Sequence, residues 1–148
     1  MPYIKPRRRV SHMLGGKGVN MSEIRVNKIQ LQDAGKKVLW FSRHTMTAEQ
    51  LGALGTVREI VQCDGTISSA WELAEEINDC DIIAIVAPIN LQQQFLKLAG
   101  DKPVIMALSE RVITPDPEGG ESKVEFVFQK WERLVKIEVE KEDFIPAE

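Results

Sequence analysis

The sequence has few residues that bind metals or form cross-links, with two cysteines and two histidines among 148 residues. Cys63 and Cys80 lie far apart, and neither belongs to a C-x-x-C pair. Their spacing relative to the histidines matches no zinc-binding pattern. We therefore expect reduced thiols in a cytoplasmic protein, and we expect neither a metal nor another cofactor.

Long apolar runs and a strong net charge are also missing. The longest apolar stretch, DIIAIVAPINL, is shorter than a membrane-spanning helix and contains a proline, so we expect no membrane partner. The formal net charge of −3 provides no strong field for binding nucleic acid. A chain of this length is expected to form one domain with its own core.

The motifs of several common enzyme folds are absent. The chain contains no G-x-G-x-x-G, no G-x-x-x-x-G-K-[ST] and no G-x-S-x-G. A dinucleotide enzyme, a P-loop NTPase and a hydrolase with a nucleophile elbow are therefore unsupported. Any phosphate contact in this chain would depend on side chains more than on a glycine-rich backbone.

The first twenty residues, MPYIKPRRRVSHMLGGKGVN, differ from the rest because they carry five basic residues and no acidic one. A basic arm could bind nucleic acid electrostatically. We favour a second explanation, in which translation starts at Met21 and the codons for Lys17–Val19 supply a purine-rich ribosome-binding sequence. In either case we expect residues 1–20 to be disordered or loosely attached, and residues 21–148 to form the domain.

Strand patterns alternate with helix patterns along the middle of the chain. Alternating apolar and polar residues predict a half-buried strand over 24–32. Four apolar strands and three intervening helices follow, and we expect them at 36–41, 47–55, 56–63, 70–78, 81–88, 91–99 and 102–108. Strands that alternate with helices imply parallel βαβ units. We therefore predict an α/β fold with an open, Rossmann-like, mostly parallel sheet of about four βα-linked strands and an extra N-terminal strand.

Three helices begin at residues that favour capping. Thr47 with Gln50 has the capping-box spacing, as has Ser69 with Glu72. Asn90 is suited to cap the helix over 91–99.

The C-terminal part predicts an antiparallel hairpin. A turn-rich segment covers 114–122, and strand alternation continues over 123–131 and 133–144. We expect this hairpin, residues 123–144, at a sheet edge or as a dimerising arm. Trp40 and Trp71 lie on apolar faces of their predicted elements, so we expect both in the core.

Polar residues follow each predicted central strand, where open α/β sheets bind ligands. They include Ser42, Arg43, His44, Thr45, Asn90, Ser109 and Arg111. Nearby helix N-termini favour anions. We therefore expect Ser42, Thr45, Asn90, Ser109 and Arg111 to bind a phosphate-bearing ligand.

Arg43 and His44 are the candidate catalytic residues. Histidine transfers protons near neutral pH, and arginine holds and neutralises a phosphodiester. Simpler alternatives remain open: His44 could be a turn residue bonded to backbone, and Arg43 could pair with Glu49 on the surface.

The stretch VLWFSRHTMTAEQL resembles the opening of small CRISPR-associated proteins. Those begin with an apolar strand, then F-S-H or V-S-R-H, and often L-T-x-x-Q entering a helix; Arg43 departs from the F-S-H form. The matching residues are Phe41, Ser42, Arg43, His44, Met46, Thr47 and Gln50. The resemblance covers about fifteen residues and implies a Rossmann-like homodimer of antiviral defence that senses or degrades cyclic oligoadenylate messengers. Its site would include Ser42, Arg43, His44 and Thr45.

This resemblance implies a ring nuclease that needs no metal. The ribose 2′-OH would attack its own phosphate, with positioning and charge stabilisation supplying most of the catalysis. A two-fold dimer would present two rims to a symmetric ring. The alternative hypothesis is a non-enzymatic accessory protein of a bacterium or mobile element, whose C-terminal hairpin pairs with a partner or a second copy.

Overall fold

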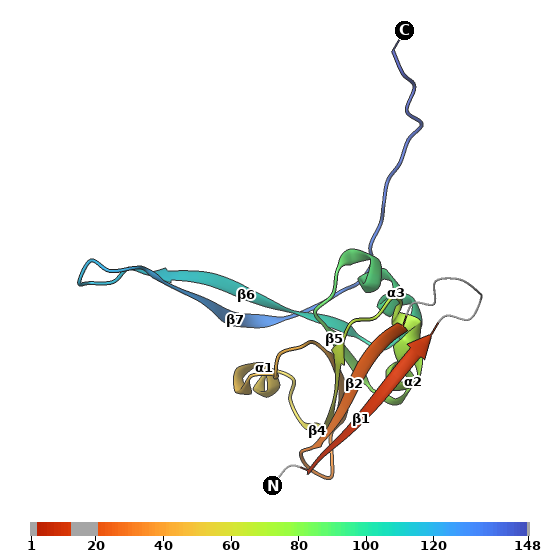
Figure 1. Ribbon diagram of the computed structural model, residues 1–148, viewed down its shortest axis with the longest axis horizontal. Coiled ribbons are helices and arrows are strands. Elements are labelled where there is room, and N and C mark those ends of the chain that lie inside the picture. Colours follow the sequence, from red (N-terminus) through yellow and green to blue (C-terminus); the bar gives the residue numbers. More distant parts are fainter. Residues whose placement is uncertain (1–2, 13–20, 148) are drawn as a thin grey trace.

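A seven-stranded mixed sheet organises the residues that the structure, a computed structural model, describes, namely 3–12 and 21–147 (Figure 1). The strands are β1 (Tyr3–His12), β2 (Met21–Gln30), β3 (Lys36–Phe41), β4 (Val57–Gly65), β5 (Ile82–Ile85), β6 (Val104–Thr114) and β7 (Lys123–Arg133). The helices are α1 (Ala48–Gly52), the 3-10 helix η1 (Ala70–Leu73), α2 (Ala74–Asp79) and α3 (Ile89–Ala99). No helix in these residues is long and apolar enough to cross a membrane.

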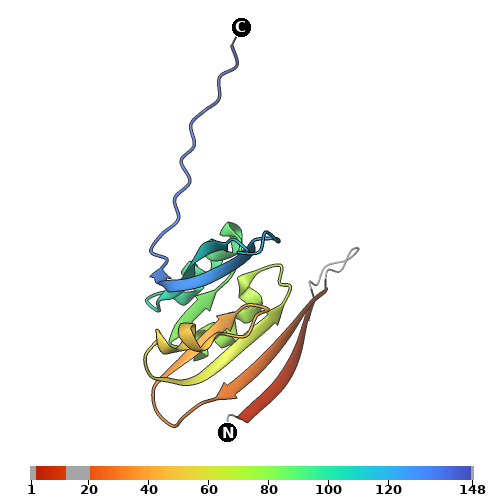
Figure 2. The same ribbon diagram turned by 90° about the vertical axis from the view of Figure 1, so that its left-hand side faces the viewer.

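The sheet has the order β1-β2-β4-β3-β5-β6-β7, with β1 and β7 at its edges (Figure 2). The four central strands run parallel, since helical segments connect each to the next. β2 and β7 join this block in antiparallel orientation, and β1 pairs with β2. The predicted α/β class is confirmed, and the arrangement is consistent with a Rossmann-like sheet.

Different helices cover the two faces of the sheet. Successive strand side chains point to opposite faces. Leu39 and Phe41 therefore belong to the core under η1, α2 and α3, whereas Val38 and Trp40 belong to the core on the α1 side. Figure 1 shows α1 separated from α2 and α3 by the strands. The prediction that Trp40 is buried is confirmed.

The two predicted capping boxes are formed. The hydroxyl oxygen of Thr47 accepts from the Gln50 backbone N–H at 3.1 Å, and the Gln50 side chain accepts from the Thr47 N–H at 2.9 Å. Ser69 and Glu72 form the equivalent box at the start of η1. These caps fix where the helices begin after β3 and β4.

Asn90 does not cap α3, contrary to the prediction. Pro88 is the N-cap, and its carbonyl accepts from the N–H groups of Leu91 and Gln92 at 3.0 and 2.9 Å. The extended conformation of Pro88 ends the preceding segment, so the helix begins at Ile89. Asn90 therefore lies exposed in the first turn.

Trp71 is 62% exposed, and the prediction that it lies in the core is wrong. The residues that η1 and α2 bury against the sheet include Ala70, Leu73 and Ile77. The 3-10 turn that follows the Ser69 cap sets this spacing and directs the indole outward.

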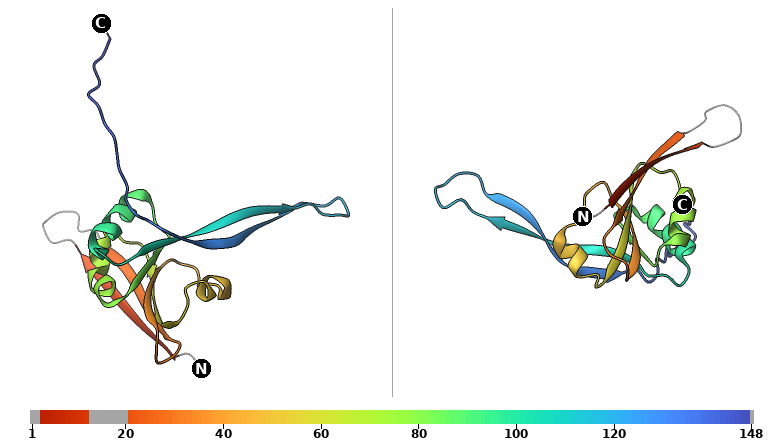
Figure 3. Two further views of the ribbon diagram at one scale, coloured as in Figure 1. Left: turned by 180° about the vertical axis from the view of Figure 1, so that it is seen from behind. Right: turned by 90° about the horizontal axis from the view of Figure 1, so that it is seen from below.

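The hairpin of the C-terminal region is formed by β6 and β7, and not by residues 123–144 as predicted. β6 continues past Leu108 to Thr114 and pairs with β7 across the turn at 115–122, so both strands project from the body as an arm (Figures 1 and 3). Residues 134–147 form neither helix nor strand. Strand pairing with β7 therefore replaces the rim turn expected at Ser109.

Residues 3–12 form β1, antiparallel to β2, where a disordered leader was expected. Ladder pairing with β2 supplies hydrogen-bond partners for this backbone. The rest of that prediction, residues 1–2 and 13–20, lies outside the described residues.

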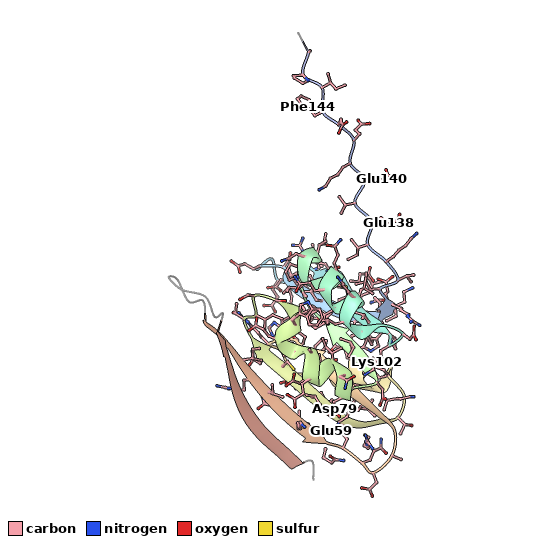
Figure 4. The ribbon with its side chains drawn as sticks, turned by 90° about the vertical axis from the view of Figure 1, so that its right-hand side faces the viewer. Glu59, Asp79, Lys102, Glu138, Glu140 and Phe144 are labelled. Carbon is pink, nitrogen blue, oxygen red and sulfur yellow. The ribbon has the colours of Figure 1, made fainter. Side chains whose placement is uncertain are left out.

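A polar network lies at the amino-terminal ends of the parallel strands. The Lys37 ammonium lies 2.6 Å from the Asp79 carboxylate and 3.5 Å from that of Glu59. The Lys102 ammonium donates to the carbonyls of Ile77 and Asn78, near the end of α2. Figure 4 shows Glu59, Asp79 and Lys102 on this side of the molecule. The cations thus neutralise buried or helix-terminal oxygens.

The Lys37–Asp79 pair predicts a dependence of stability on pH. The hydrogen bond between them lowers the pKa of Asp79 below 3.8 and raises the pKa of Lys37 above 10.5. The stabilisation is present from about pH 4 to about pH 10; it is lost as pH falls through the lowered pKa of Asp79 or rises through the raised pKa of Lys37. Because Asp79 is half-exposed, Asp79→Asn should reduce the free energy of unfolding by at most about 1 kcal/mol at neutral pH.

Urea unfolding at about pH 7 and about pH 2 checks this expectation. The difference between wild type and Asp79→Asn should disappear at the lower pH. Asp101→Asn, at an exposed turn, is the control and should show no difference at either pH. An equal effect of Asp79→Asn at both pH values would contradict the assignment.

Candidate functional site

A pocket of about 370 Å³ lies at the carboxyl ends of β3, β4 and β5. Phe41 pairs with both Cys63 and Ile85, so the three strands end nearly level. β3 lies between β4 and β5, which makes this a point where the strand order reverses. Open α/β sheets bind ligands at such points. The pocket is lined by Phe41, Ser42, Arg43, His44, Cys63, Gly65, Thr66, Ile67, Val86, Pro88 and Leu91.

Hydrogen bonds fix the backbone of the turn that carries Arg43 and His44. The Ser42 hydroxyl oxygen accepts from the His44 N–H at 3.1 Å. The side-chain amide of Gln62 donates to the carbonyls of Ser42 and His44, both at 3.0 Å. The indole N–H of Trp40 donates to the His44 carbonyl at 2.7 Å. This side of the pocket is therefore positioned by the sheet below it.

Arg43 crosses the mouth of the pocket. Its guanidinium donates to the Thr66 hydroxyl oxygen at 2.9 Å, which joins the turns after β3 and β4. Arg43 forms this bond and not the ion pair with Glu49 that was left open as an alternative. A guanidinium has five N–H donors, so most remain available to an anion. Arg43 and His44 are both exposed at the same rim.

The interior of the pocket is apolar. Phe41, Ile67 and Leu91 are buried and line it. The Phe41 ring contacts that of Phe95 in α3, with centroids 5.3 Å apart. An apolar interior with a few polar groups at the mouth is the usual composition of a small-molecule site. This arrangement can accept a flat apolar ring that carries an anionic group.

The other predicted ligand-binding residues do not line this pocket. Thr45 is exposed one residue beyond its edge, and Asn90 lies in the first turn of α3. Ser109 and Arg111 lie on the projecting part of β6, opposite Phe128 and Phe126 of β7. The structure therefore brings Ser42, Arg43 and His44 together and separates them from the second serine–arginine pair.

Sequence reasoning did not select Gln62 and Thr66 for this site. Thr66 follows β4 on the same rim, so its position after a central strand was the available signal. Gln62 lies within the strand, and nothing in its sequence context indicates that its amide holds two carbonyls of another turn. Both cysteines are buried, and burial raises the pKa of the Cys80 thiol to about 12. It therefore remains a thiol.

A scan against protein-family models found no match, and searches of curated proteins and of solved structures found none either. Within the described residues, no group of three or more histidine, cysteine, aspartate or glutamate side chains could hold a metal ion. The functional interpretation therefore depends on the pocket and its rim.

Proposed function

We propose that the pocket binds a phosphate-bearing nucleotide. The observation that carries this proposal is the placement of Arg43 and His44 at the mouth of an apolar pocket, beyond three parallel strands. The base would lie against Phe41 and Leu91, and the phosphate would meet the free donors of Arg43. The volume of about 370 Å³ falls within the range of small-molecule sites and suits one nucleotide unit.

A cyclic oligoadenylate is the ligand class that the resemblance of the FSRH segment suggests. Each pocket would take one nucleotide unit of the ring. A two-fold dimer with a Rossmann-like sheet in each subunit would supply a second, symmetry-related pocket. A free mononucleotide and a cyclic messenger both present a base and a phosphate, so the binding experiment must compare the two directly.

Cleavage of the ring is the second candidate function. The ribose 2′-OH would lose its proton as its oxygen attacks the adjacent phosphorus, the bond from phosphorus to the 5′-oxygen would break, the 5′-oxygen would take up a proton, and a 2′,3′-cyclic phosphate would form. The His44 imidazole is exposed where it could accept the first proton or donate the second, and Arg43 could stabilise the phosphorane charge. Because Arg111 lies on the arm, one guanidinium lines each pocket. A single guanidinium supports binding more directly than cleavage.

Arg43→Gln is expected to weaken nucleotide binding about tenfold to a hundredfold, since it removes a charge-assisted hydrogen bond worth about 1.5–3 kcal/mol. Thermal shift and calorimetry with AMP and with cyclic oligoadenylates of several ring sizes, in EDTA, measure this. Binding raises the apparent melting temperature by mass action. Arg58→Gln, at the amino-terminal end of β4, is the control and should bind like wild type.

Chromatography of the same mixtures tests cleavage. His44→Asn should retain ligand binding and lose linear products if His44 transfers the proton. If the wild-type protein binds the ligand but forms no linear products, the cleavage hypothesis is refuted and the binding hypothesis stands. Failure of wild type to bind any nucleotide, or equal affinity in Arg43→Gln, would refute the nucleotide proposal.

A further inference from the structure

Exposed apolar side chains gather on two segments of the chain. We call residues 108–130 the arm and residues 134–147 the tail. Of thirteen exposed large apolar residues in the described part of the chain, nine lie in these segments. They are Leu108, Ile113, Val124, Phe126, Val127, Val135, Val139, Phe144 and Ile145. Exposed apolar surface of this kind marks interaction surfaces.

The arm has one apolar face and one mixed face. Directly paired residues of an antiparallel ladder share a face. The apolar face consists of the pairs Ser109–Phe128, Arg111–Phe126 and Ile113–Val124. The mixed face consists of Glu110–Val127, Val112–Glu125 and Thr114–Lys123, and it contains an ion pair of 2.7 Å between Lys123 and Glu125. The apolar face therefore carries one charge, that of Arg111.

This apolar face is anchored in the core. The Phe128 ring lies 5.6 Å from that of Trp131 in an edge-to-face contact. Trp131 packs in the same way on buried Trp40 at 5.9 Å, and its indole N–H donates to the Gln50 carbonyl at 2.9 Å. The root of the arm is thus held by the sheet and by α1. Phe126, further along the same face, is 73% exposed.

The tail has the residue alternation of a β-strand, but it pairs with no strand of the described sheet. Val135, Ile137 and Val139 alternate with charged residues at the period of a strand. Leu134 still donates its N–H to the Val104 carbonyl at 2.8 Å. Val135 and Ile137 line a pocket together with Leu96 of α3. Beyond them the chain leaves the body as an extended segment (Figures 1 and 2), and Figure 4 shows Glu138, Glu140 and Phe144 along it.

We propose that the tail of one copy adds as a strand to the outer edge of β7 in a second copy, and that the exchange is reciprocal. β7 is an edge strand, so its outer N–H and C=O groups have no ladder partner within the described sheet. Each copy then supplies one donor segment and one acceptor edge, as a closed two-fold dimer requires.

The side chains of the tail match this edge. Its apolar residues, Val135, Ile137 and Val139, lie on one side of a strand and would extend the apolar face of the arm. Glu138 and Glu140 lie on the other side. Together with Lys136, these two carboxylates would run along the mixed face of the arm, which carries charges of both signs.

Sedimentation equilibrium of the full chain tests the exchange. Wild type should have twice the mass of one chain. Phe126→Ser on the arm and Val139→Asp on the tail should each raise the dimer dissociation constant at least about tenfold. Val127→Ser, on the mixed face of the same strand, is the matched control and should leave the constant unchanged. Thermal unfolding confirms that each variant is folded.

Three results would overturn the proposal. The first is a wild-type protein that remains monomeric at about 100 µM. The second is a dimer that only one of Phe126→Ser and Val139→Asp weakens, because the arm and the tail would then not contact each other. The third is equal weakening by Val127→Ser. Since none of these variants touches the pocket, nucleotide binding can succeed or fail independently.

Discussion

Phe95→Ala is expected to reduce the free energy of unfolding by about 3–5 kcal/mol. Phe95 is fully buried in α3, and its ring contacts that of Phe41 in β3. Truncation would remove this contact and leave a cavity between the helix and the sheet. Small domains are typically stable by only about 5–15 kcal/mol, so the variant would lose a large part of that stability.

Urea unfolding followed by circular dichroism measures the change in midpoint. Trp71→Ala is the matched control, because it removes a larger aromatic ring from a position that is 62% exposed. It should cost less than about 1 kcal/mol. Equal losses in the two variants would show that α3 does not pack on β3 through Phe95.

Gly35→Ala is expected to cost about 2–4 kcal/mol through backbone strain and overlap. Gly35 has a φ of +117°, a region that other residues rarely adopt. A Cβ atom at this position would lie 2.5 Å from the Thr56 carbonyl oxygen, and backbone at that site moves only with the start of β4. The Lys36 N–H donates to the same oxygen at 2.9 Å.

Gly52→Ala gives the opposite expectation in the same assay. An added Cβ at Gly52 meets no atom within 4 Å, and the residue ends α1. Alanine there should be neutral or stabilise by up to about 1 kcal/mol. The urea midpoint should therefore fall for Gly35→Ala and stay unchanged or rise for Gly52→Ala. A midpoint for Gly35→Ala at or above that of wild type would contradict the tight turn between β2 and β3.

Local patterns predicted the central part of the fold well. The apolar segment before Ser42 and the β-branched run at 81–88 contain buried strands because a parallel sheet covered on both faces needs apolar residues on both. The capping residues Thr47 and Ser69 act within one turn, so sequence alone determines them. The prediction that Trp71 lies in the core was wrong because the first turn after Ser69 is a 3-10 helix, and this type of turn determines which side chains face the sheet.

The prediction for the arm was wrong because its structure depends on residues far apart in the sequence. Apolar residues stop near Leu108, and a serine follows, which indicated a turn. Whether the chain turns there depends on a partner strand, and β7 pairs with β6 through Thr114. Pairing across the 115–122 turn is a tertiary property that composition does not reveal. Arg111 was therefore placed at the pocket, although it lies on the arm.

The prediction of the site was correct for the residues whose position follows from the strand order alone. Ser42, Arg43 and His44 line the pocket because they follow a central parallel strand. Gln62 was missed because its role comes from the register of β4 against β3, which aligns it with Trp40. Residues that hold a site in position depend on such alignments more than residues that face the ligand do.

The contact between Trp40 and Trp131 gives the protein its own optical probe. The chain has three tryptophans, and these two form an edge-to-face pair that joins the arm to the pocket turn. Trp40 donates to the His44 carbonyl at the pocket, and Trp131 donates to the Gln50 carbonyl in α1. Trp71 is exposed to water, so we expect its emission to be red-shifted. We expect the blue-shifted component of the fluorescence to come from the pair that lies between the pocket and the arm, so that this pair can be followed without a label.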